Sequence, residues 1–579
     1  MAATRTDTLL FMFFRRMRMP LIVLISAYAI ATLGFTLMPG VDDQGQPWRM
    51  SLFEAFYVVS YTGSTIGFGE VPYAFTPAQR MWTIVSIYLT VIAWLFSVGS
   101  IIALLQDPVY MNALRRSRLA GGVRATSRPF YLVCGYGDTG RVLTHTLSAR
   151  GYPVVVIDRQ REKINTLAVE DLGASIRAFD MDARTPDNLV AAGLRNRWCA
   201  GVIAVTGDDQ VNLKIAISAK LLNHKVVVHA RADSARVRDN MRSFNTDHVV
   251  NPVEEYRRRF ELAINAPDLF RLHHWLTSGP GAHLPDRPSL PRGRWIVCGY
   301  SNVGKAIYRV LGDNGMETVL IDADPDAGDR PPDTIRGRGT QAETLEQAGI
   351  ERAAGVVAAT GDDADNLSIL ITARALKPDL FLAALESGYS GRVLFRAAGP
   401  DFVGQPSMVV AGTILASISS NLAVPFIEEM VQQDNDFARA LLAKLLRHRE
   451  PKAPEFSATR ISARRSPAIA HALEQGREIR LGKLLVNPRR RDQRLPLEVL
   501  MLRRDDKNIL CPDDATCLKI GDRLLVAGWQ QAATRIRTTL ENEHALEYVL
   551  TGQDYQSGWV WRWFEQRFGS SEFGHDKPR

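Results

Sequence analysis

The chain of 579 residues has few cysteines, and they lie far apart. Five cysteines are too few and too scattered for a disulfide framework, and because none forms a Cys-x-x-Cys pair, a zinc site is disfavoured as well. Charged residues make up 23% and apolar residues 46%, the balance of a folded chain rather than a disordered or fibrous one. A mean hydropathy near zero excludes a chain that is mostly embedded in a membrane, but it leaves room for a small membrane part.

Two segments near the N-terminus lack any charged residue, Met19–Val41 and Met81–Gln106. Each is long enough to cross a hydrocarbon core of ~30 Å at ~1.5 Å per residue. The first could instead be a secretory signal peptide, but no small-x-small cleavage site follows it and a second apolar run does. We therefore expect two membrane-spanning helices.

Arginines flank these two runs on the sides that face away from their connection. No acidic residue occurs from Pro108 to Gly137. By the positive-inside rule both termini are then cytoplasmic, and the protein is a multi-pass protein of the cell (inner) membrane. Because much of the excess of 70 basic over 62 acidic residues lies beside the membrane, we expect no nucleic-acid partner, and Arg489–Arg491 is interpreted as a solvated loop. The flanking arginines are Arg5, Arg15, Arg16, Arg18, Arg115, Arg116, Arg118, Arg124 and Arg128.

The connection between the two runs is apolar and rich in glycine at one point. Ser51–Ser60 forms a helix candidate too short to span, and Thr65–Gly69 follows with glycines at alternating positions. Such glycines permit backbone angles in which successive carbonyl groups point the same way. Extended backbone in a membrane must line a polar cavity, and four copies around an axis would stack rings of oxygens that replace the hydration shell of a cation. One chain cannot close such a ring, so this interpretation requires a homotetramer.

This segment resembles the selectivity filter of potassium channels, and the helix–loop–helix layout resembles the simplest members of that superfamily. Phe68 stands in place of the usual tyrosine and cannot donate a hydrogen bond behind the filter, and Glu70 replaces the usual aspartate. No glycine lies between Gly69 and Gly99, so the inner helix lacks a mid-helix glycine hinge. Taken alone, the motif could be a glycine-rich turn. The resemblance implies K⁺ as the permeant ion and a filter made of Thr65, Ile66, Gly67, Phe68, Gly69 and Glu70.

The remaining sequence contains an internal repeat. Tyr131–Gly140 returns as Trp295–Gly304, and Pro153–Asp158 returns as Glu317–Asp322 at the same offset. Each copy alternates short apolar runs with helical stretches, which predicts a parallel sheet with crossover helices. The strands expected in the first copy are Phe130–Cys134, Val154–Ile157, Ser175–Ala178, Gly201–Val205 and Val226–His229.

In each copy a glycine motif follows the first strand and opens a helix, and an acidic residue ends the second strand. This context is typical of dinucleotide-binding folds. Gly135 would make the tight turn, Gly137 would let the backbone approach a pyrophosphate, and Gly140 would allow close helix–strand packing. Asp158 can accept hydrogen bonds from ribose hydroxyls and would repel a 2′-phosphate, which favours NAD(H) or an adenine nucleotide over NADP(H). A fold of this type that has lost its ligand is the alternative.

The repeat also resembles the RCK (regulator of K⁺ conductance) domain. That resemblance implies that Asp182 and Thr206 face the nucleotide and that Arg231 reaches phosphate. The paired Asp208 and Asp209 could face the ligand or cap the next helix, and we favour the cap. The candidate residues of the first site are Gly135, Tyr136, Gly137, Asp138, Thr139, Gly140, Asp158, Arg159, Asp182, Thr206 and Arg231.

The second copy departs from the first at three positions. Ser301 replaces the middle glycine, Arg338 stands where the first copy has Asp182, and Leu385 stands in the place of Arg231. We expect an altered site that is empty, structural or occupied by a different ligand. Its candidate residues are Gly299, Tyr300, Ser301, Asn302, Val303, Gly304 and Asp322.

Helices are expected after each copy, to about Trp275 and over Val409–Arg447. The strand pattern of Ile479–Trp529 resembles the C-terminal lobe of some RCK domains. For the tail, both an interfacial membrane contact and a packed terminal element stay open; it carries Trp559, Trp561 and Trp563.

The expected architecture is multidomain, with an all-α membrane pore domain of two transmembrane helices and a re-entrant pore helix. Two Rossmann-like α/β RCK domains and a small α+β C-terminal lobe follow. The predicted parts are a cytoplasmic N-terminus (1–19), the pore domain (20–107), a linker (108–128), the first RCK domain (129–276), a linker (277–293), the second RCK domain with crossover helices (294–450), the lobe (451–541) and a tail (542–579).

The predicted function is a tetrameric potassium channel, not an enzyme, gated by NAD(H) or an adenine nucleotide on a cytoplasmic ring of RCK domains. Its expected partners are three further copies, membrane lipid and the nucleotide. One alternative is a membrane-anchored, nucleotide-sensing regulatory protein. An NAD-dependent oxidoreductase is a weaker one, because the sequence offers no separate substrate domain with a positioned acid or base. A cation pore without K⁺ selectivity is a variant of the main prediction.

Overall fold

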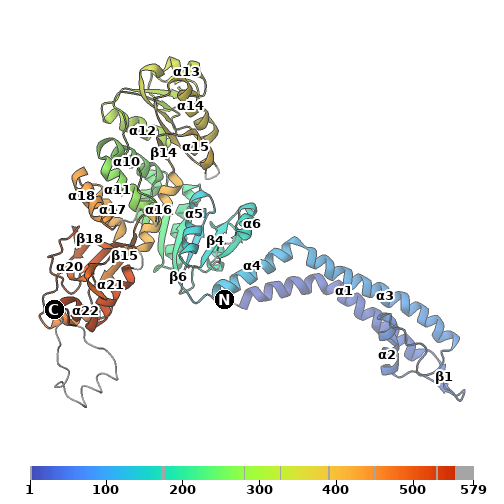
Figure 1. Ribbon diagram of the computed structural model, residues 1–579. Helices are drawn as coiled ribbons and strands as arrows, with labels where there is room; N and C mark the ends of the chain where they lie inside the picture. Colours follow the sequence, from blue (N-terminus) through green and yellow to red (C-terminus); the bar gives the residue numbers. More distant parts are fainter. Residues whose placement is uncertain are drawn as a thin grey trace, which may run out of the picture. The chain divides into compact units, whose positions relative to one another are not determined.

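The computed structural model describes residues 3–170, 172, 176–279, 281–326, 328–388, 391–448, 452–529 and 532–553. The chain divides into two compact units, Met1–Ser127 and Arg128–Arg579, whose elements are labelled in Figure 1. The three tryptophans of the predicted tail lie outside the described residues.

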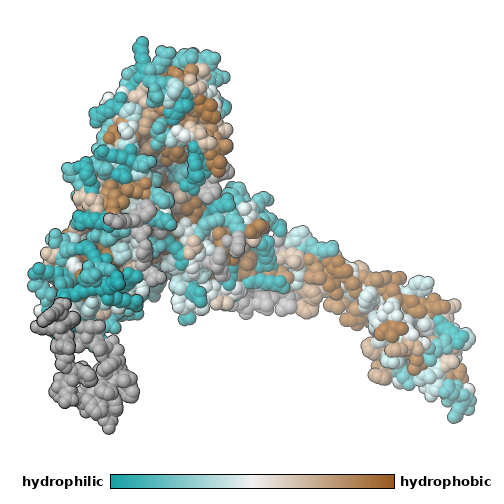
Figure 2. Space-filling model, viewed as in Figure 1, coloured by the Kyte–Doolittle hydropathy of each residue, from teal (hydrophilic) through white to brown (hydrophobic). Residues whose placement is uncertain are grey.

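The first unit is built from helices. They are α1 (Ala3–Leu37), α2 (Leu52–Gly63), α3 (Pro77–Gln106) and α4 (Pro108–Arg124), with a small hairpin of β1 (Gly40–Val41) and β2 (Pro47–Trp48). The Phe13–Leu37 part of α1 and all of α3 are long and apolar enough to cross a membrane. Figure 2 shows apolar side chains along the surface of these two helices, as expected for a lipid-facing surface.

Helices α1 and α3 run antiparallel and pack closely. A Cβ built on Gly34 would lie 2.0 Å from the ring of Trp82, whose indole nitrogen donates to the Ala31 carbonyl at 3.0 Å. At the other end, Ser97 Oγ donates to the Pro20 carbonyl at 3.2 Å. Glycine at position 34 is therefore needed for the ring of Trp82 to reach α1.

The predicted linker 108–128 is mostly a helix. Asp107 has extended backbone angles, and its side chain accepts a hydrogen bond from the backbone N–H of Tyr110 at 3.2 Å, as an N-terminal cap does. Pro108 has no backbone N–H to continue α3, so the chain breaks there and starts α4.

The second unit contains two parallel six-stranded sheets, which confirms the predicted fold class. Their strand orders are β5-β4-β3-β6-β7-β8 and β11-β10-β9-β12-β13-β14, the order of a dinucleotide-binding fold. The sixth strand of each sheet has only three residues and escaped prediction from pattern. The strands are β3 (Phe130–Cys134), β4 (Val154–Asp158), β5 (Ile176–Asp180), β6 (Cys199–Ala204), β7 (Val227–Arg231), β8 (His248–Val250), β9 (Arg294–Cys298), β10 (Thr318–Asp322), β11 (Ile335–Arg336), β12 (Ala353–Ala358), β13 (Phe381–Leu385) and β14 (Phe402–Gly404).

Crossover helices connect these strands. The first copy has α5 (Asp138–Ala149), α6 (Arg161–Val169), α7 (Pro186–Ala191), α8 (Asp209–Leu222) and α9 (Ala235–Ser243). The second has α12 (Asn302–Asp313), α13 (Ala342–Gln347), the 3₁₀ turn η1 (Ile350–Arg352), α14 (Asp363–Leu376) and α15 (Arg392–Ala398).

The helices that follow each copy are shorter than predicted. The helix expected to about Trp275 is broken at Pro267 into α10 (Pro252–Asn265) and α11 (Pro267–Thr277). The helical stretch predicted over Val409–Arg447 consists of three helices: α16 (Pro406–Ser419), α17 (Ala423–Met430) and α18 (Asn435–Leu446). The side chain of Asp434 caps α18, which explains one of those breaks.

The two copies exchange their terminal helices. Helix α10 packs on α12 of the second copy, and Phe260 joins the core that surrounds Trp295. Helix α16 packs on α5 of the first copy, and Ile414 joins the core around Leu143 (Figure 1). Each copy therefore completes the hydrophobic core of the other.

The C-terminal lobe is an antiparallel sheet with the order β15-β20-β18-β19. One face packs on α11, α17 and α18, and the other on the small helices of the lobe. The triplet Arg489–Arg491 is solvent-facing, but it enters a short exposed strand rather than a loop. The elements are β15 (Glu455–Arg460), α19 (Pro467–Glu474), α20 (Leu481–Leu484), β16 (Val486–Asn487), β17 (Arg490–Arg494), β18 (Leu497–Arg504), β19 (Lys507–Leu510), β20 (Arg523–Gly528), α21 (Ala532–Glu541) and α22 (Glu543–Thr551).

Candidate pore loop and nucleotide site

The short helix α2 starts at a complete capping box. Ser51 Oγ accepts a hydrogen bond from the backbone N–H of Glu54 at 3.3 Å, and the Glu54 carboxylate accepts from the backbone N–H of Ser51 at 2.8 Å. One face of the helix is buried in the first unit through Ala55, Val58 and Val59. The cap and this buried face fix where the helix ends and where the glycine loop begins.

The backbone of that loop alternates in handedness. Thr65, Gly67 and Gly69 have φ of 64°, 65° and 93°. A positive φ is strained for a β-branched residue, so its occurrence at Thr65 marks a conformation that the surroundings impose. The backbone N–H groups of Ile66 and Gly67 both point back to the Tyr61 carbonyl, at 2.9 and 3.3 Å. These two N–H groups therefore point toward α2.

Tyr61 supplies the hydroxyl that Phe68 lacks. Its Oη donates to the Gly69 carbonyl at 2.6 Å, and its ring meets Phe68 edge-on at 5.6 Å between centroids. The ring of Phe68 also stacks on Tyr57 at 6.3 Å. Sequence reasoning missed Tyr61, although the spacing of Tyr57 and Tyr61 on one face of α2 was a usable signal. A hydrogen bond behind the loop is therefore present although Phe68 cannot make it, and its donor, Tyr61, lies on α2.

Glu70 is tied back to the start of α3. Its carboxylate accepts from the backbone N–H of Phe75 at 2.8 Å and pairs with Arg80 at 2.8 and 3.2 Å. Glu70, predicted as the last residue of the filter, thus anchors the end of the loop.

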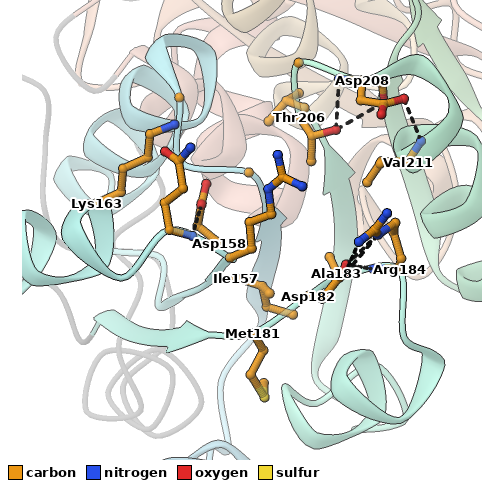
Figure 3. A pocket seen from close by; sticks show the side chains of 16 residues that line it. Ile157, Asp158, Lys163, Met181, Asp182, Ala183, Arg184, Thr206, Asp208 and Val211 are labelled. Carbon is orange, nitrogen blue, oxygen red and sulfur yellow. Dashed lines mark hydrogen bonds and ion pairs between the residues drawn. The ribbon is translucent and has the colours of Figure 1, made fainter.

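A cavity of about 350 Å³ opens at the carboxyl ends of β3, β4 and β6 (Figure 3). Several predicted residues line it, and others do not: Tyr136, Asp138, Thr139, Gly140 and Arg231 are not among the lining residues. The predicted residues that line it are Gly135, Gly137, Asp158, Arg159, Asp182 and Thr206. Residues missed from sequence include Gln160, Lys163, Met181, Ala183 and Arg184, each within a few positions of a predicted acidic residue.

Three glycines of the first copy, Gly135, Gly137 and Gly140, differ in why glycine is needed there. Gly135 has φ of +103°, and a Cβ there would lie 2.9 Å from the backbone nitrogen of Thr206. A Cβ on Gly140 would lie 1.9 Å from the Gly135 carbonyl oxygen. At Gly137 a Cβ would meet no atom within 4 Å, and φ is −86°. The fold requires the outer two glycines, whereas the middle one only leaves space in the cavity.

The start of α5 is open to a ligand. Its N-cap is Gly137, which has no side chain to bond the first backbone N–H groups. These groups and the helix dipole favour an anion at this point.

Asp158 is buried and held in place from the backbone. Its carboxylate accepts from the N–H groups of Tyr136 at 2.7 Å and Gln160 at 2.8 Å, which fixes it against the glycine loop. Across the cavity Asp182 forms a bidentate pair with Arg184, whose hydrogen bonds hold the pKa of Asp182 below its usual range. The cavity thus has a carboxylate on each side, Asp158 fixed by backbone N–H groups and Asp182 paired with Arg184.

Two other predicted groups have partners within the protein. Arg231 pairs with Asp233 at 2.7 Å, so a phosphate contact would require it to leave that ion pair. Asp208 caps α8 by accepting from two N–H groups of its first turn, as predicted, and it also lines the cavity. Asp209 accepts instead from the backbone N–H groups of Asp233 and Ser234, both at 2.8 Å.

In the second copy a serine occupies the start of the helix. Ser301 Oγ accepts from the backbone N–H of Gly304 at 3.1 Å and donates to the Ala359 carbonyl at 2.7 Å. One of the N–H groups left open in α5 therefore has a side-chain acceptor in α12.

The acidic residue of the second copy is also engaged. Arg330 donates to Asp322 at 3.0 Å, and its guanidinium lies 5.5 Å from the centre of the Tyr300 ring. Arg338, the counterpart of Asp182, pairs with Asp365 at 3.4 Å. Asp322 and Arg338 of the second copy thus each have a charged partner within the protein.

Comparisons with known proteins agree with the division of the chain into a membrane part and two repeated copies. Residues 20–107 match the model of the ion channel family, and residues 131–252 and 295–406 each match the TrkA-N domain. Potassium channel protein 1 of Methanocaldococcus jannaschii is 26% identical over 230 residues, which cover 39% of this chain and 66% of that protein. The chain thus aligns with about two thirds of the length of that relative.

Two solved structures of GsuK are similar in fold. The complex with ADP is 19% identical, covers 71% of this chain and 98% of its own, and has a TM-score of 0.43. The channel bound to NAD is 15% identical, covers 92% and 99%, and also has a TM-score of 0.43.

Proposed function

We propose that this chain is a two-transmembrane-helix potassium channel with tandem RCK domains, which works as a K⁺-selective homotetramer gated by a nucleotide. Four copies of residues 20–107 form the pore in the cell (inner) membrane, with both termini in the cytoplasm. Residues 129–276 and 294–450 of each chain are the two RCK domains, and residues 451–541 form the lobe. Eight RCK domains suffice for one closed cytoplasmic ring.

The alternation of positive φ at Thr65, Gly67 and Gly69 is the observation that carries the pore proposal. Such an alternation lets consecutive carbonyls share a direction, and four copies then offer a dehydrated cation a stack of oxygen rings. The strain at Thr65 supports a functional loop, because an ordinary turn would place glycine or asparagine there.

The ligand we propose for the first site is NAD(H) or an adenine nucleotide. Its phosphates meet the open start of α5 at Gly137, and Asp158 accepts from the ribose hydroxyls. Lys163 lines the same cavity and supplies a further positive charge for the phosphates (Figure 3). ADP and NAD are the ligands of the similar GsuK structures, which is the same class of molecule.

Gating follows from a change in the angle between the two copies when the first site fills. The second site has a structural role, since Ser301 and Arg330 already occupy it. Helix α4 carries the change to α3 across the break at Asp107. A coupling of ~1–3 kcal/mol per site is typical, and four sites together can supply the ~5.5 kcal/mol that moves a gate from mostly shut to mostly open.

The test is ion flux from liposomes that contain only this protein. We expect K⁺ flux to exceed Na⁺ flux, and one or more of NAD⁺, NADH, ADP and ATP, added in turn, to change it. Gly67→Val should abolish flux while ADP binding persists, because the filter and the nucleotide site lie in different units. Absence of K⁺ flux under every condition would sink the channel proposal, and nucleotide turnover without flux would favour an enzyme.

A further inference from the structure

A second cavity, of about 490 Å³, lies where the two copies meet. Its walls come from α10 and α11 at the end of the first copy and from β14 and α16 at the end of the second. The connecting segment 285–289 forms part of its rim. This volume is in the range of sites that hold small molecules. It is separate from the cavity at the glycine loop, with which it shares no lining residue.

The wall of this cavity contains a buried arginine without a carboxylate partner. Arg259 is only 6% exposed, and no described acidic side chain forms an ion pair with it, although the charge of Glu255 raises its pKa against the larger, lowering effect of burial. Its guanidinium meets two neutral groups, His274 Nδ1 at 3.2 Å and Thr277 Oγ1 at 2.8 Å. Its Nε has no hydrogen-bond partner among the described residues. A guanidinium in a protein interior is costly unless a negative group meets it, so this position is electrostatically incomplete.

A second buried polar group stands beside it. Tyr256 is 1% exposed, lines the same cavity, and its hydroxyl finds no partner among the residues that the structure describes. Residues three apart on a helix share a face, so Tyr256 and Arg259 present two donors on one side of α10. Burial raises the pKa of Tyr256, so its hydroxyl stays protonated and can donate.

The protonation states of the side chains in the cavity wall favour an anion over a cation as the ligand. Burial lowers the pKa of Arg259 to about 10, so the guanidinium remains charged at neutral pH. Burial lowers the pKa of His274 to about 3, and its ring is neutral, with Nδ1 used as an acceptor. The two lining carboxylates are engaged elsewhere or exposed: Asp401 accepts from the backbone N–H of Leu382 at 2.8 Å, and Asp286 lies on the exposed rim.

One side of the cavity is apolar. Phe270 and Phe402 lie with ring centroids 5.6 Å apart, and Val409 of α16 completes this side. Such walls suit a flat hydrocarbon body better than a bare hydrated ion.

We propose that this cavity binds a small organic anion, a carboxylate or a phosphate ester, whose charged group meets Arg259 and Tyr256 and whose flat body lies against Phe270 and Phe402. Because both copies contribute walls, occupancy stabilises their pairing. The ligand is distinct from the nucleotide of the first site, and its binding requires neither ion conduction nor nucleotide.

The probes are benzoate, phenyl phosphate, inorganic phosphate and neutral benzamide, titrated against the full chain in detergent by ligand-observed NMR. We expect saturable binding of benzoate or phenyl phosphate, and whichever binds more tightly identifies the preferred charged group. Benzamide and inorganic phosphate should bind about tenfold more weakly, because each lacks half of the recognition. Gly137→Ser should leave this binding unchanged, since the two cavities are separate.

Three variants assign the binding to the cavity. Arg259→Met should weaken it about tenfold or more, and Tyr256→Phe several-fold. Arg258→Met is the control, because it removes the same charge from the preceding position of α10, where the guanidinium pairs with Glu255 at 3.5 Å. It should leave the affinity unchanged. The proposal is overturned if neither anion binds at millimolar concentration, if benzamide binds equally well, or if both cavity variants bind as the wild type does. Should Arg259→Met fail to fold, Tyr256→Phe alone decides.

Discussion

Replacing the middle glycine of the first site by serine should close that site in the way the second copy is already closed. Gly137 and Ser301 have similar backbone angles, φ −86° and ψ −165° against φ −58° and ψ 168°. A Cβ at Gly137 meets no atom within 4 Å, so the fold accepts the change. By analogy with Ser301, the new hydroxyl would bond the N–H of Gly140 and the Val205 carbonyl.

The magnitude follows from the hydrogen bond that the nucleotide loses. A charge-assisted hydrogen bond contributes ~1.5–3 kcal/mol, so we expect Gly137→Ser to weaken ADP binding about 10- to 150-fold. The same change caps α5, and the free energy of unfolding should rise by a few tenths of a kcal/mol or stay equal. Weaker binding with undiminished stability is the signature that separates this mechanism from misfolding.

The assay is calorimetric titration of ADP into the full chain in detergent, with thermal unfolding measured in parallel. Ser301→Gly is the matched control and should leave the first-site affinity unchanged. It should create no second binding event either, because Arg330 still occupies Asp322. If Gly137→Ser binds ADP as tightly as the wild type does, phosphate does not sit at the start of α5 and the reasoning is refuted.

Two further predictions concern groups outside the nucleotide cavity. Tyr61→Phe removes the hydrogen bond to the Gly69 carbonyl, which is worth ~0.5–1.5 kcal/mol per subunit, and should lower the K⁺/Na⁺ flux ratio. Tyr57→Phe is the control and should leave the ratio unchanged, because the Tyr57 hydroxyl has no partner among the described residues. Burial lowers the pKa of His229 to about 3, so below pH 6.5 the unfolded chain binds a proton that the folded chain excludes, and stability falls by ~2 kcal/mol by pH 5. His229→Gln should flatten the fall in Tm between pH 7 and 5, while exposed His224→Gln should not; equal pH slopes in both variants would contradict this assignment.

The sequence predicted the spanning helices and the sheets well because their signals are local. A run without charge needs no partner to be identified, and the predicted end of the second run, Gln106, is the end of α3. The strand Phe130–Cys134 was predicted to the residue, since a buried parallel strand is an uninterrupted apolar segment between a charged flank and a glycine. Helix breaks were harder: the prolines at 108 and 267 mark them, but their effect was not anticipated.

At the first site, Gly135, Gly137 and Asp158 were singled out from the sequence and line the cavity, because their positions depend on spacing along one strand–turn–helix unit. Lys163 and Arg184 line the same cavity but belong to no motif, and only the curvature of the chain brings them there. Arg231 illustrates the opposite case. Its position after the fifth strand was predicted, yet its side chain pairs with Asp233.

What the sequence determined by itself is everything encoded within a few turns of chain: apolar length, strand alternation, glycine spacing and caps. Only the tertiary structure decided which distant groups meet. It placed the Tyr61 hydroxyl on the Gly69 carbonyl, exchanged α10 and α16 between the two copies, and left Arg259 buried with its Nε unpartnered among the described residues. These contacts depend on how separate elements pack, and no local pattern records which faces will be buried against each other.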